Sequence, residues 1–395
     1  MEGSFRPLEG IRVVEMSHMI MGPSCGMFLA LLGAEVIKVE PPEGDKTRDL
    51  GGMGSAFFPL FNRGKKSVQL DLKTDAGREA LQALLATADV FVENFRDSTL
   101  EKIGAGLHEL NELYPGLIVA SHKGFLHGPY QDRTALDEVV QMMTGLAYMT
   151  GPTGRPLRVG SSANDIMAGL FGTLAISLAL RERDRTGKGR DIRIGLFENC
   201  LMLVAQHMVQ FELHGVNPPP MPERDFSWPV YDIFDTADGG QIFVGAVTEG
   251  QWRLLCEFLG LDDLVRDERL QTRMDQIDAR AWTIPRIAEA IATRTADDMA
   301  ARFEEMGIPF SPIARPCDMY EDPHVLRAGG LATSRMPDGK AFRAPTLPIE
   351  VDGRVLDGGG DVAAVGADTD AVLGALGMSE ADIARARGTR SRTGR

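Results

Sequence analysis

The chain has 395 residues, of which 44% are hydrophobic and 25% charged, so it can bury a sizeable core and form two domains of ordinary size. Its formal net charge of −14 excludes a broadly basic surface, and we expect neither nucleic acid nor membrane as a partner. The first ten residues lack an apolar signal segment, and no uninterrupted apolar run reaches about 18 residues. We therefore expect a cytoplasmic protein without a membrane span.

Apolar runs typical of buried strands alternate with helical patterns in the first third of the chain. The expected strands are 11–16, 35–40, 67–72, 89–95 and the beginning of 116–125. The expected helices are 22–34, 75–88 and 100–115. Because parallel strands need helical crossovers and are buried on both faces, this alternation predicts a parallel α/β sheet.

The pattern then becomes mainly helical from 137 to 215, with long helices expected at 138–150 and 165–187. We expect the methionines of this region, Met142, Met143 and Met149, to lie in the core. The Pro-rich stretch 217–226 is typical of a linker. After it, 228–247 predicts a hairpin, and helical segments at 249–260, 279–294 and 295–307 predict a small α+β domain over about 227–330.

The end of the chain has an extended stretch at 341–353 and a last expected helix at 368–377. The basic, small-residue tail after about Ile383 is typical of a frayed end.

Four cysteines are scattered along the chain: Cys25, Cys200, Cys256 and Cys317. None forms a CxxC pair or accompanies a histidine cluster with metal-ligand spacing. We expect buried or half-buried free thiols in a reducing compartment, no metal site and no permanently bound cofactor.

Standard nucleotide motifs are missing, since no GxGxxG follows a strand and no GxxxxGK[ST] occurs. Residues 22–26 match GxSxG, but a nucleophile elbow needs its serine directly after a strand, and Ser24 is separated from the strand by several residues. We expect this stretch to be a helix N-terminus whose free N–H groups can receive phosphate or carbonyl oxygen.

Basic residues cluster at or near the ends of the expected strands, at the edge where open α/β sheets bind ligands. They are either a cradle for phosphates or ordinary surface charge, and they comprise Lys38, Arg48, Arg63, Lys65, Lys66, Lys102 and Lys123.

Asp165 opens an expected helix after a small-residue loop, in RVGSSANDIMAGLFG. An aspartate at this place is a good helix cap, and the residues alone do not distinguish a cap from a nucleophile. Ser161 and Ser162 are its neighbours in that loop.

Several stretches resemble the type III CoA-transferase family (CaiB/BaiF), which includes formyl-CoA transferase, carnitine CoA-transferase and the racemising α-methylacyl-CoA racemase branch. LEGIRVVEMSHMIMGPSCGMFLALLGAEVIKVEPPEGD and FNRGKKSVQLDLKTDAG are similar to the family's first blocks, and ENFRDSTLEKIG and ASHKGF to the next. RVGSSANDIMAG is similar to its catalytic block. RTGKGRDIRIGLFE, GIPFSPIARP and VGADTDAVLGALG complete a set that runs through most of the chain.

The resemblance implies an interlocked homodimer in which each chain has a Rossmann-like large domain and a small α/β domain. It assigns 1–216 to the large CoA-binding domain, 217–226 to a linker and 227–330 to the small domain. Residues 331–395 would be a second linker and a C-terminal part that returns to the large domain. The stretches 217–226 and 341–353 would be the crossing segments.

The resemblance also implies that Asp165 is a covalent nucleophile that carries the acyl group and then CoA, with an acyl-CoA and a small carboxylic acid as substrates. CoA would lie against His18, Met19 and Ile20. Its phosphates or adenine would lie near Asn62, Lys65, Asn94, Lys102 and Lys123.

Three departures from the family pattern matter. Formyl-CoA transferase often has a basic residue after its KVE-type strand, whereas this chain has Pro41, so the phosphate contact would pass to Lys38 or Arg48. The glycine-rich loop that shields the formyl enzyme's intermediates is not visible, which argues against formyl or oxalate. The racemase histidine is also missing, since the corresponding stretch is 134–137, Thr-Ala-Leu-Asp, although His127 is nearby.

The sequence therefore predicts a CoA-transferase that uses an acyl-CoA such as succinyl-CoA. Arg133 and Arg158 lie near the motif and could each hold a second carboxylate, which favours a dicarboxylic substrate. A racemase-like enzyme and a non-catalytic CoA-binding protein remain alternatives.

Overall fold

A computed structural model describes residues 5–356 and 358–388 and divides the chain into two compact units. The first unit combines residues up to Pro222 with those from Pro323 onward, and the second is Glu223–Asp322. The second unit thus ends before residue 330, where the sequence placed its boundary.

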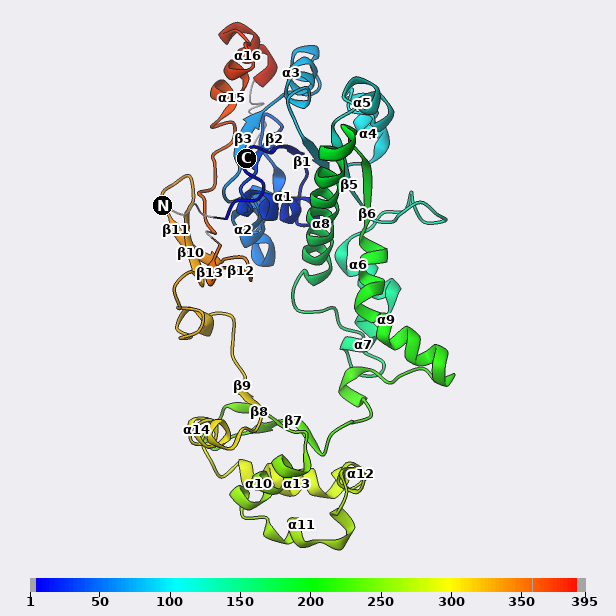
Figure 1. Cartoon of the computed structure of the whole chain (residues 1–395), viewed down its shortest axis with the longest axis vertical. Coiled ribbons are helices and arrows are strands. Elements are labelled where there is room, and N and C mark those ends of the chain that lie inside the picture. Colours follow the sequence, from blue (N-terminus) through cyan, green and yellow to red (C-terminus); the bar gives the residue numbers. More distant parts are fainter. Residues whose placement is uncertain (1–4, 357, 389–395) are drawn as a thin grey trace. The chain divides into compact units, whose positions relative to one another are not determined.

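A six-stranded parallel sheet forms the centre of the first unit (Figure 1). Its order is β3-β2-β1-β4-β5-β6, the doubly wound order. Strands are added in one direction from β1 to β3 and in the other from β4 to β6, so the switch point lies between β1 and β4. The predicted Rossmann-like sheet is confirmed, and β6 is a strand that the sequence patterns did not predict. The strands are β1 Arg12–Met16, β2 Glu35–Glu40, β3 Lys66–Gln69, β4 Val90–Glu93, β5 Ile118–Lys123 and β6 Asp191–Gly195.

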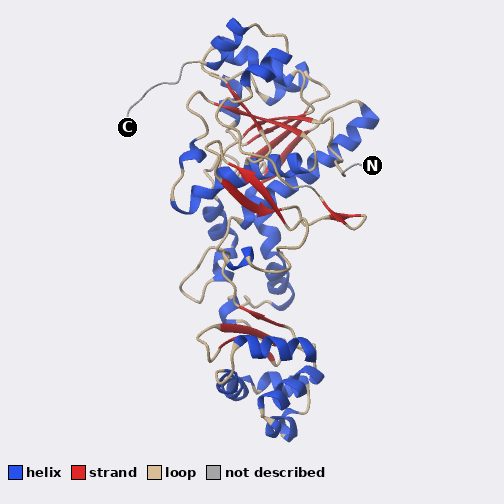
Figure 2. Ribbon diagram, turned by 90° about the vertical axis from the view of Figure 1, so that its left-hand side faces the viewer, coloured by secondary structure: helices blue, strands red, loops and turns tan. Residues whose placement is uncertain are grey.

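Alternate side chains of each strand enter two different cores, because successive residues of a strand point to opposite faces. Val13 packs under α1 Met21–Leu31, α8 Ala163–Thr186 and α9 Leu196–His214, whereas Val14 packs under α3 Asp75–Leu85, α4 Asp97–Lys102 and α5 Leu107–Leu113. Figure 2 shows helices on both sides of the strands. The expected single helix at 100–115 is two helices, because Gly104 turns left-handed between them.

Two glycines let α8 approach α1 closely. A Cβ on Gly169 would lie 2.0 Å from Ser24 Oγ, and one on Gly172 would lie 3.1 Å from Cys25 Sγ of α1 and 2.5 Å from His122 Nε2 of β5. This contact fixes the height of the first turn of α8, which carries Asp165, relative to the sheet.

Helix α8 is also long and apolar enough to cross a membrane by length and composition alone. In the structure it packs on α1, β5 and β6, and 44% of its most apolar window is buried. Packing within the first unit accounts for many of its apolar residues.

The segment between β5 and α8 forms α6 Asp137–Thr144 and α7 Leu146–Thr150, separated by the left-handed Gly145. Met149 is buried as expected, but Met142 and Met143 are exposed, so the prediction that they lie in the core is wrong for this chain by itself.

The C-terminal segment packs on the first sheet. Its helices α15 Thr369–Ala375 and α16 Glu380–Arg387 cover β3 and α3, and Leu373 and Ile383 enter that core. The tail is therefore helical as far as Arg387, contrary to the expected frayed end after Ile383, and its remainder from 389 lies outside the described residues. Before it come β10 Leu331–Arg335, β11 Ala341–Pro345, β12 Glu350–Val351 and β13 Arg354–Val355.

The second unit packs five helices around a three-stranded antiparallel sheet of order β7-β8-β9. The hairpin β7–β8 confirms the prediction around 237–240. Its elements are β7 Val230–Asp235, β8 Gln241–Ala246, α10 Glu249–Leu259, α11 Asp262–Arg266, α12 Arg273–Asp278, α13 Arg280–Ile291, α14 Ala296–Met306 and β9 Phe310–Pro312. The second unit also contains the 3₁₀ turns η4 Glu268–Leu270 and η5 Asp318–Tyr320. The remaining short elements of the chain are α2 Phe57–Phe61 and the 3₁₀ turns η1 Lys46–Asp49, η2 Gly52–Ala56 and η3 Met221–Glu223.

Candidate active site

Asp165 lies in the first turn of α8, on the wall of a cavity of about 310 Å³. The helix N-cap is Ser162, which makes no side-chain cap hydrogen bond, so the capping role that the sequence left open for Asp165 is not seen. Burial and the charge of Asp137 raise the pKa of Asp165 to about 7, although Arg158 acts in the opposite direction. The carboxyl group is therefore ionised in a large fraction of molecules at neutral pH.

The sequence-predicted residues gather around this cavity only in part. His18, Met19 and Ile20 line it, and so do Asn94, Lys123, Arg158 and Asp165. Asn62, Lys65, Lys38, Lys102 and Arg133 do not line it.

The cavity lies at the carboxyl ends of β1 and β4, where the strand order reverses. Asn94, after β4, accepts a hydrogen bond from the His18 N–H (3.1 Å) and donates one to the His18 carbonyl (2.9 Å). The His18 ring lies 5.4 Å from the Phe95 ring, and burial lowers the pKa of His18. Asn94 thus joins the two central strands at the ligand-binding edge of the sheet.

Arg158 lines the Asp165 cavity and is held by neighbouring groups. It donates to Asp137 (3.1 Å) and to the Ser161 carbonyl (3.3 Å), and it pairs with Glu138 (3.2 Å). Its Nε is buried and has no hydrogen-bond partner among the residues that the structure describes. Arg158 therefore anchors the loop before α8.

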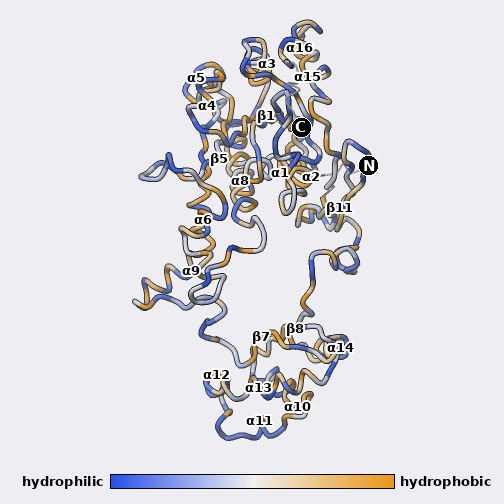
Figure 3. The backbone as a smooth tube through the Cα atoms, turned by 180° about the vertical axis from the view of Figure 1, so that it is seen from behind, coloured by the Kyte–Doolittle hydropathy of each residue, from blue (hydrophilic) through white to orange (hydrophobic). Residues whose placement is uncertain are grey.

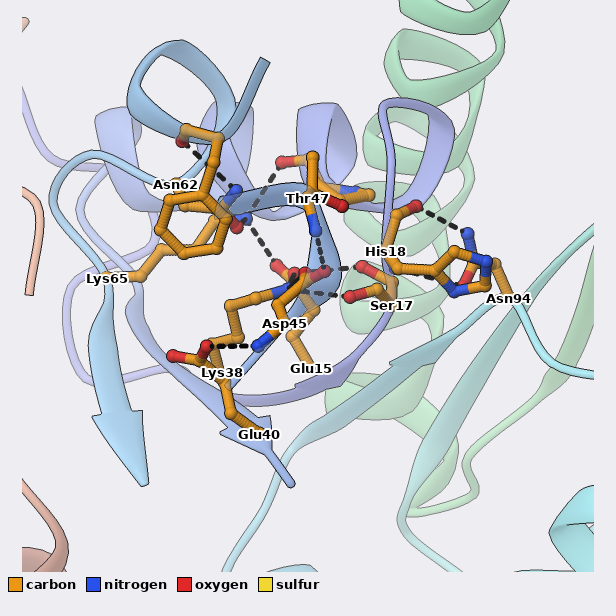
Figure 4. A network of polar contacts seen from close by, with 12 residues as sticks. Glu15, Ser17, His18, Lys38, Glu40, Asp45, Thr47, Asn62, Lys65 and Asn94 are labelled. Carbon is orange, nitrogen blue, oxygen red and sulfur yellow. Dashed lines mark hydrogen bonds and ion pairs between the residues drawn. The ribbon is translucent and has the colours of Figure 1, made fainter. Parts of the chain in front are cut away.

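Two of the predicted phosphate ligands are buried inside the protein instead (Figure 4). Lys38 pairs with Glu15 and Asp45, and Lys65 pairs with Glu15. Asn62 accepts from Lys65 and donates to the Phe58 carbonyl. The sequence could not show that these acids and lysines meet, because they lie on different strands and loops.

A second cavity of about 460 Å³ shares its wall with the first through Asn94, His122, Lys123, Gly124 and Ala135. Lys123 is held by Glu93 (2.9 Å), Asp97 (2.8 Å) and the Phe95 carbonyl (2.5 Å). The second cavity also carries Arg96, His127, Arg133 and Arg193.

Arg96 and Arg133 are the cations of the second cavity for which the described residues provide no carboxylate partner. Arg96 donates to the Thr134 hydroxyl (3.3 Å), and the Arg133 guanidinium lies over the Tyr130 ring. Sequence reasoning missed Arg96, although it follows Asn94 directly beyond β4. Lys102, at the end of α4, is exposed and lines neither cavity.

The competing motifs find no support in the geometry. Ser24 is fully buried inside α1 and donates to the Met21 carbonyl, so the GxSxG stretch is no nucleophile elbow. His127 lines the second cavity rather than that of Asp165, and its ring lies 3.3 Å from the Gln131 side chain. Among the described residues, no group of three or more His, Cys, Asp or Glu side chains could hold a metal.

A family model, CoA-transferase family III, matches residues 8–369. The chain belongs to this family. It is therefore a CoA-transferase, and its relatives support transfer of CoA to carboxylic acids. The sheet, the switch-point cavity and Asp165 described above are parts of this family III CoA-transferase.

The relatives of this CoA-transferase include two named enzymes. It is 33% identical over 348 residues to succinyl-CoA–D-citramalate CoA-transferase of Chloroflexus aurantiacus, covering 84% of this chain and 85% of the relative. It is 34% identical over 360 residues to succinate–glutarate CoA-transferase of Agrobacterium fabrum, covering 87% and 89%. A CaiB/BaiF family protein of Brucella suis has a similar structure, with a TM-score of 0.85, 33% identity, and 94% and 99% coverage.

Proposed function

We propose that this CoA-transferase moves CoA from succinyl-CoA to a small dicarboxylic acid, with Asp165 as the nucleophile. The observation that carries the proposal is the position of Asp165 in a cavity at the switch point, beside a second, arginine-bearing cavity. The named relatives act between succinyl-CoA or succinate and the dicarboxylic acids D-citramalate and glutarate, which supports the choice of substrates.

The two adjoining cavities fit the two ends of an acyl-CoA. The thioester and pantetheine would occupy the cavity of Asp165, and the phosphates would lie in the second cavity. There Arg96 and Arg133 are open cations, and phosphate favours guanidinium groups for bidentate binding. Lys38 and Lys65 would not contact the phosphates, because internal acids already hold them.

The reaction proceeds in four balanced steps. The Asp165 carboxylate attacks the succinyl thioester, which forms a mixed anhydride and releases CoA thiolate. The thiolate attacks the aspartyl carbonyl and releases succinate, leaving an aspartyl-CoA thioester. The acceptor carboxylate then attacks this thioester and again frees CoA thiolate, which finally attacks the acceptor carbonyl and restores Asp165.

The chain's own groups assist these steps. Ile20 and Met21, at the N-terminus of α1, line the cavity, so main-chain N–H groups there can stabilise the tetrahedral oxyanions. Arg158 is the arginine that lines this cavity, and its side chain remains 19% exposed, so its guanidinium group can receive the second carboxylate of the acceptor. Arg133 serves CoA instead, because it lines the other cavity.

Asp165→Asn tests the nucleophile, with Asp184→Asn as a matched control at the exposed far end of α8. We expect the first variant to lose transfer and the second to retain it. Hydroxylamine trapping followed by mass spectrometry should place the adduct on Asp165. An Asp165→Asn variant that transfers CoA at the wild-type rate would reject the mechanism. Solvent-deuterium exchange at the acyl α-carbon without acceptor would indicate a racemase instead.

We also propose that the enzyme is an interlocked homodimer. Leu170, Leu174 and Leu178 recur every fourth residue along one exposed side of α8, at 51–58% exposure. Met202, Val209 and Leu213 of α9 are exposed as well, and hydrophobic stretches along α9 are visible in Figure 3. Apolar faces of this extent mark association surfaces. Sedimentation equilibrium should give twice the chain mass, and a monomer at micromolar concentration would contradict the proposal.

A further inference from the structure

The turn from Ser17 to Ile20, between β1 and α1, has a backbone that its sequence does not favour. Met19 has φ of 64°, in the left-handed region, and among the described non-glycine residues only Asp352 shares such a conformation. Met19 is 39% exposed and lines the cavity of Asp165. Strained residues persist where their surroundings over-determine them, and they are concentrated at functional sites.

Three different elements hold three consecutive residues of this turn (Figure 4). Lys38 of β2 donates to the Ser17 carbonyl at 2.6 Å. Asn94, after β4, binds both the N–H and the carbonyl of His18. The Thr47 hydroxyl of η1 accepts from the Met19 N–H at 3.1 Å.

The residues that form these hydrogen bonds to the turn are connected to a set of buried charges. Glu15 lies 3.4 Å from Lys38 and 2.6 Å from Lys65, and Asp45 lies 3.0 Å from Lys38. All four side chains are at most 8% exposed. Two cations face two acids, so the set offers no surplus positive charge to a phosphate.

The same set is tied to both ends of the turn. Asp45 accepts a hydrogen bond from the Thr47 N–H at 2.8 Å, which fixes the residue of η1 that binds Met19. Lys65 donates to the Pro23 carbonyl of α1 at 2.9 Å. The Glu15 carboxylate packs directly against Gly26 of α1, since a Cβ on Gly26 would lie 1.8 Å from Glu15 Oε2. The charges thus bind β1, β2, η1 and α1 around the turn.

We propose that Glu15, Lys38, Asp45 and Lys65 are positioning residues that impose the left-handed conformation on Met19 and so shape the wall opposite Asp165. They are not ligands of the CoA phosphates. This inference rests on the proposed function, because it assigns the turn a part in holding the acyl-CoA pantetheine and thioester.

Substitutions at Met19 test the conformation directly. Asparagine tolerates the left-handed region, whereas β-branched isoleucine opposes it but keeps the apolar character. We expect Met19→Ile to lower kcat about tenfold more than Met19→Asn does, because small misplacements near reacting groups slow the reaction. The reverse order would mean that the side chain matters for its hydrophobicity, and it would overturn the proposal.

Trimmed ligands test the charges separately from catalysis. Calorimetry would measure the affinities of three variants for CoA, 3′-dephospho-CoA and pantetheine. The variants are Thr47→Val, the charge-matched double variant Lys38→Met/Asp45→Asn, and Arg96→Ala. We expect the affinity for all three ligands to fall by a similar factor in Thr47→Val and in the double variant. Arg96→Ala should weaken CoA more than pantetheine, because it removes a phosphate partner.

Two outcomes overturn the inference. One is a Lys38/Asp45 double variant that loses CoA selectively, as expected of Arg96→Ala. The other is a folded Thr47→Val variant with unchanged pantetheine affinity and kcat. Thermal unfolding verifies that each variant is folded, and Thr47→Val keeps the side-chain shape if the double variant does not fold. The binding ratios need no turnover, so they stand even if Asp165 proves not to be the nucleophile.

Discussion

Asp137 of α6 and Asp165 of α8 line the same cavity, and the charge of the first helps to raise the pKa of the second to about 7. Arg158 lies 3.1 Å from Asp137 and opposes this effect. The proposed nucleophile is thus balanced between a like charge and a guanidinium. A higher pKa makes a carboxylate a stronger nucleophile once it is ionised, at the cost of a smaller ionised fraction at neutral pH.

The pH dependence of kcat/KM on the acid side should reflect the titration of Asp165. Because only ionised Asp165 attacks, we expect kcat/KM to rise with pH through about 7. Asp137→Asn removes a like charge and should move the midpoint to lower pH. Initial rates at saturating acceptor between pH 5 and 9 give the midpoint. An unchanged midpoint in Asp137→Asn would show that Asp137 does not influence the titration.

The same pKa makes a prediction about stability. The folded state holds the proton of Asp165 more tightly than the unfolded chain, so this group's contribution falls as pH rises from its unfolded pKa of about 3.9 to about 7. Asp165→Asn lacks the carboxylate. We expect the difference between its free energy of unfolding and that of wild type to be more favourable to the variant at pH 8 than at pH 4.5, by about 3 kcal/mol. Urea titrations at both pH values measure this, and an equal difference at both would contradict the assigned pKa.

The close contact between α1 and α8 should be intolerant of a single methyl group. A Cβ on Gly169 would lie 2.0 Å from Ser24 Oγ and 2.9 Å from the Met21 carbonyl oxygen. We expect Gly169→Ala to lower the free energy of unfolding by about 1–3 kcal/mol.

Gly374 provides the control for this substitution. It lies in α15, and a Cβ there would meet no atom within 4 Å. Gly374→Ala should stabilise the protein slightly, since alanine favours helices. If both variants unfold at the same urea concentration, the tight contact is not a determinant of stability.

The fold was predictable where local pattern decides it. The continuous apolar runs of β1, β2 and β4 and the amphipathic α3 identify themselves, and the parallel sheet follows from their alternation. The strand β6 escaped prediction because its half-exposed edge position gives it an Asp-Ile-Arg-Ile pattern with charges. The exposed Met142 shows a different limit, since composition does not tell whether an apolar side chain of a helix faces the core or solvent.

The gathering of Asp165 and the residues that follow β1, β4 and β5 around one cavity was predictable, because parallel strands bring their carboxyl ends together. The partners of the lysines were not predictable. Lys38 and Lys65 look like surface cations in the sequence, and only the fold brings Glu15 between them. Ion pairs between residues that are distant in the sequence leave no local pattern. The charges in the sequence therefore suggested more free cations for a phosphate cradle than the structure has.

Arg158 and Arg133 should separate acceptor binding from CoA binding. Arg158 shares the cavity of Asp165, whereas Arg133 lines the second cavity. We expect Arg158→Met to lower kcat/KM for a dicarboxylate acceptor about tenfold more than for a monocarboxylate of similar size, because a charged pair is lost only with the former.

The measurement belongs at pH 8.5, where Asp165 is ionised in wild type, so that a changed pKa does not mimic a binding defect. Arg133→Met, the matched control, should raise KM for the acyl-CoA and leave acceptor preference unchanged. An equal loss for both acceptors in Arg158→Met would mean that Arg158 acts through Asp137 and the Ser161 loop alone. The second carboxylate would then have to bind elsewhere, because Lys123, the lysine that lines this cavity, is already held by Glu93 and Asp97.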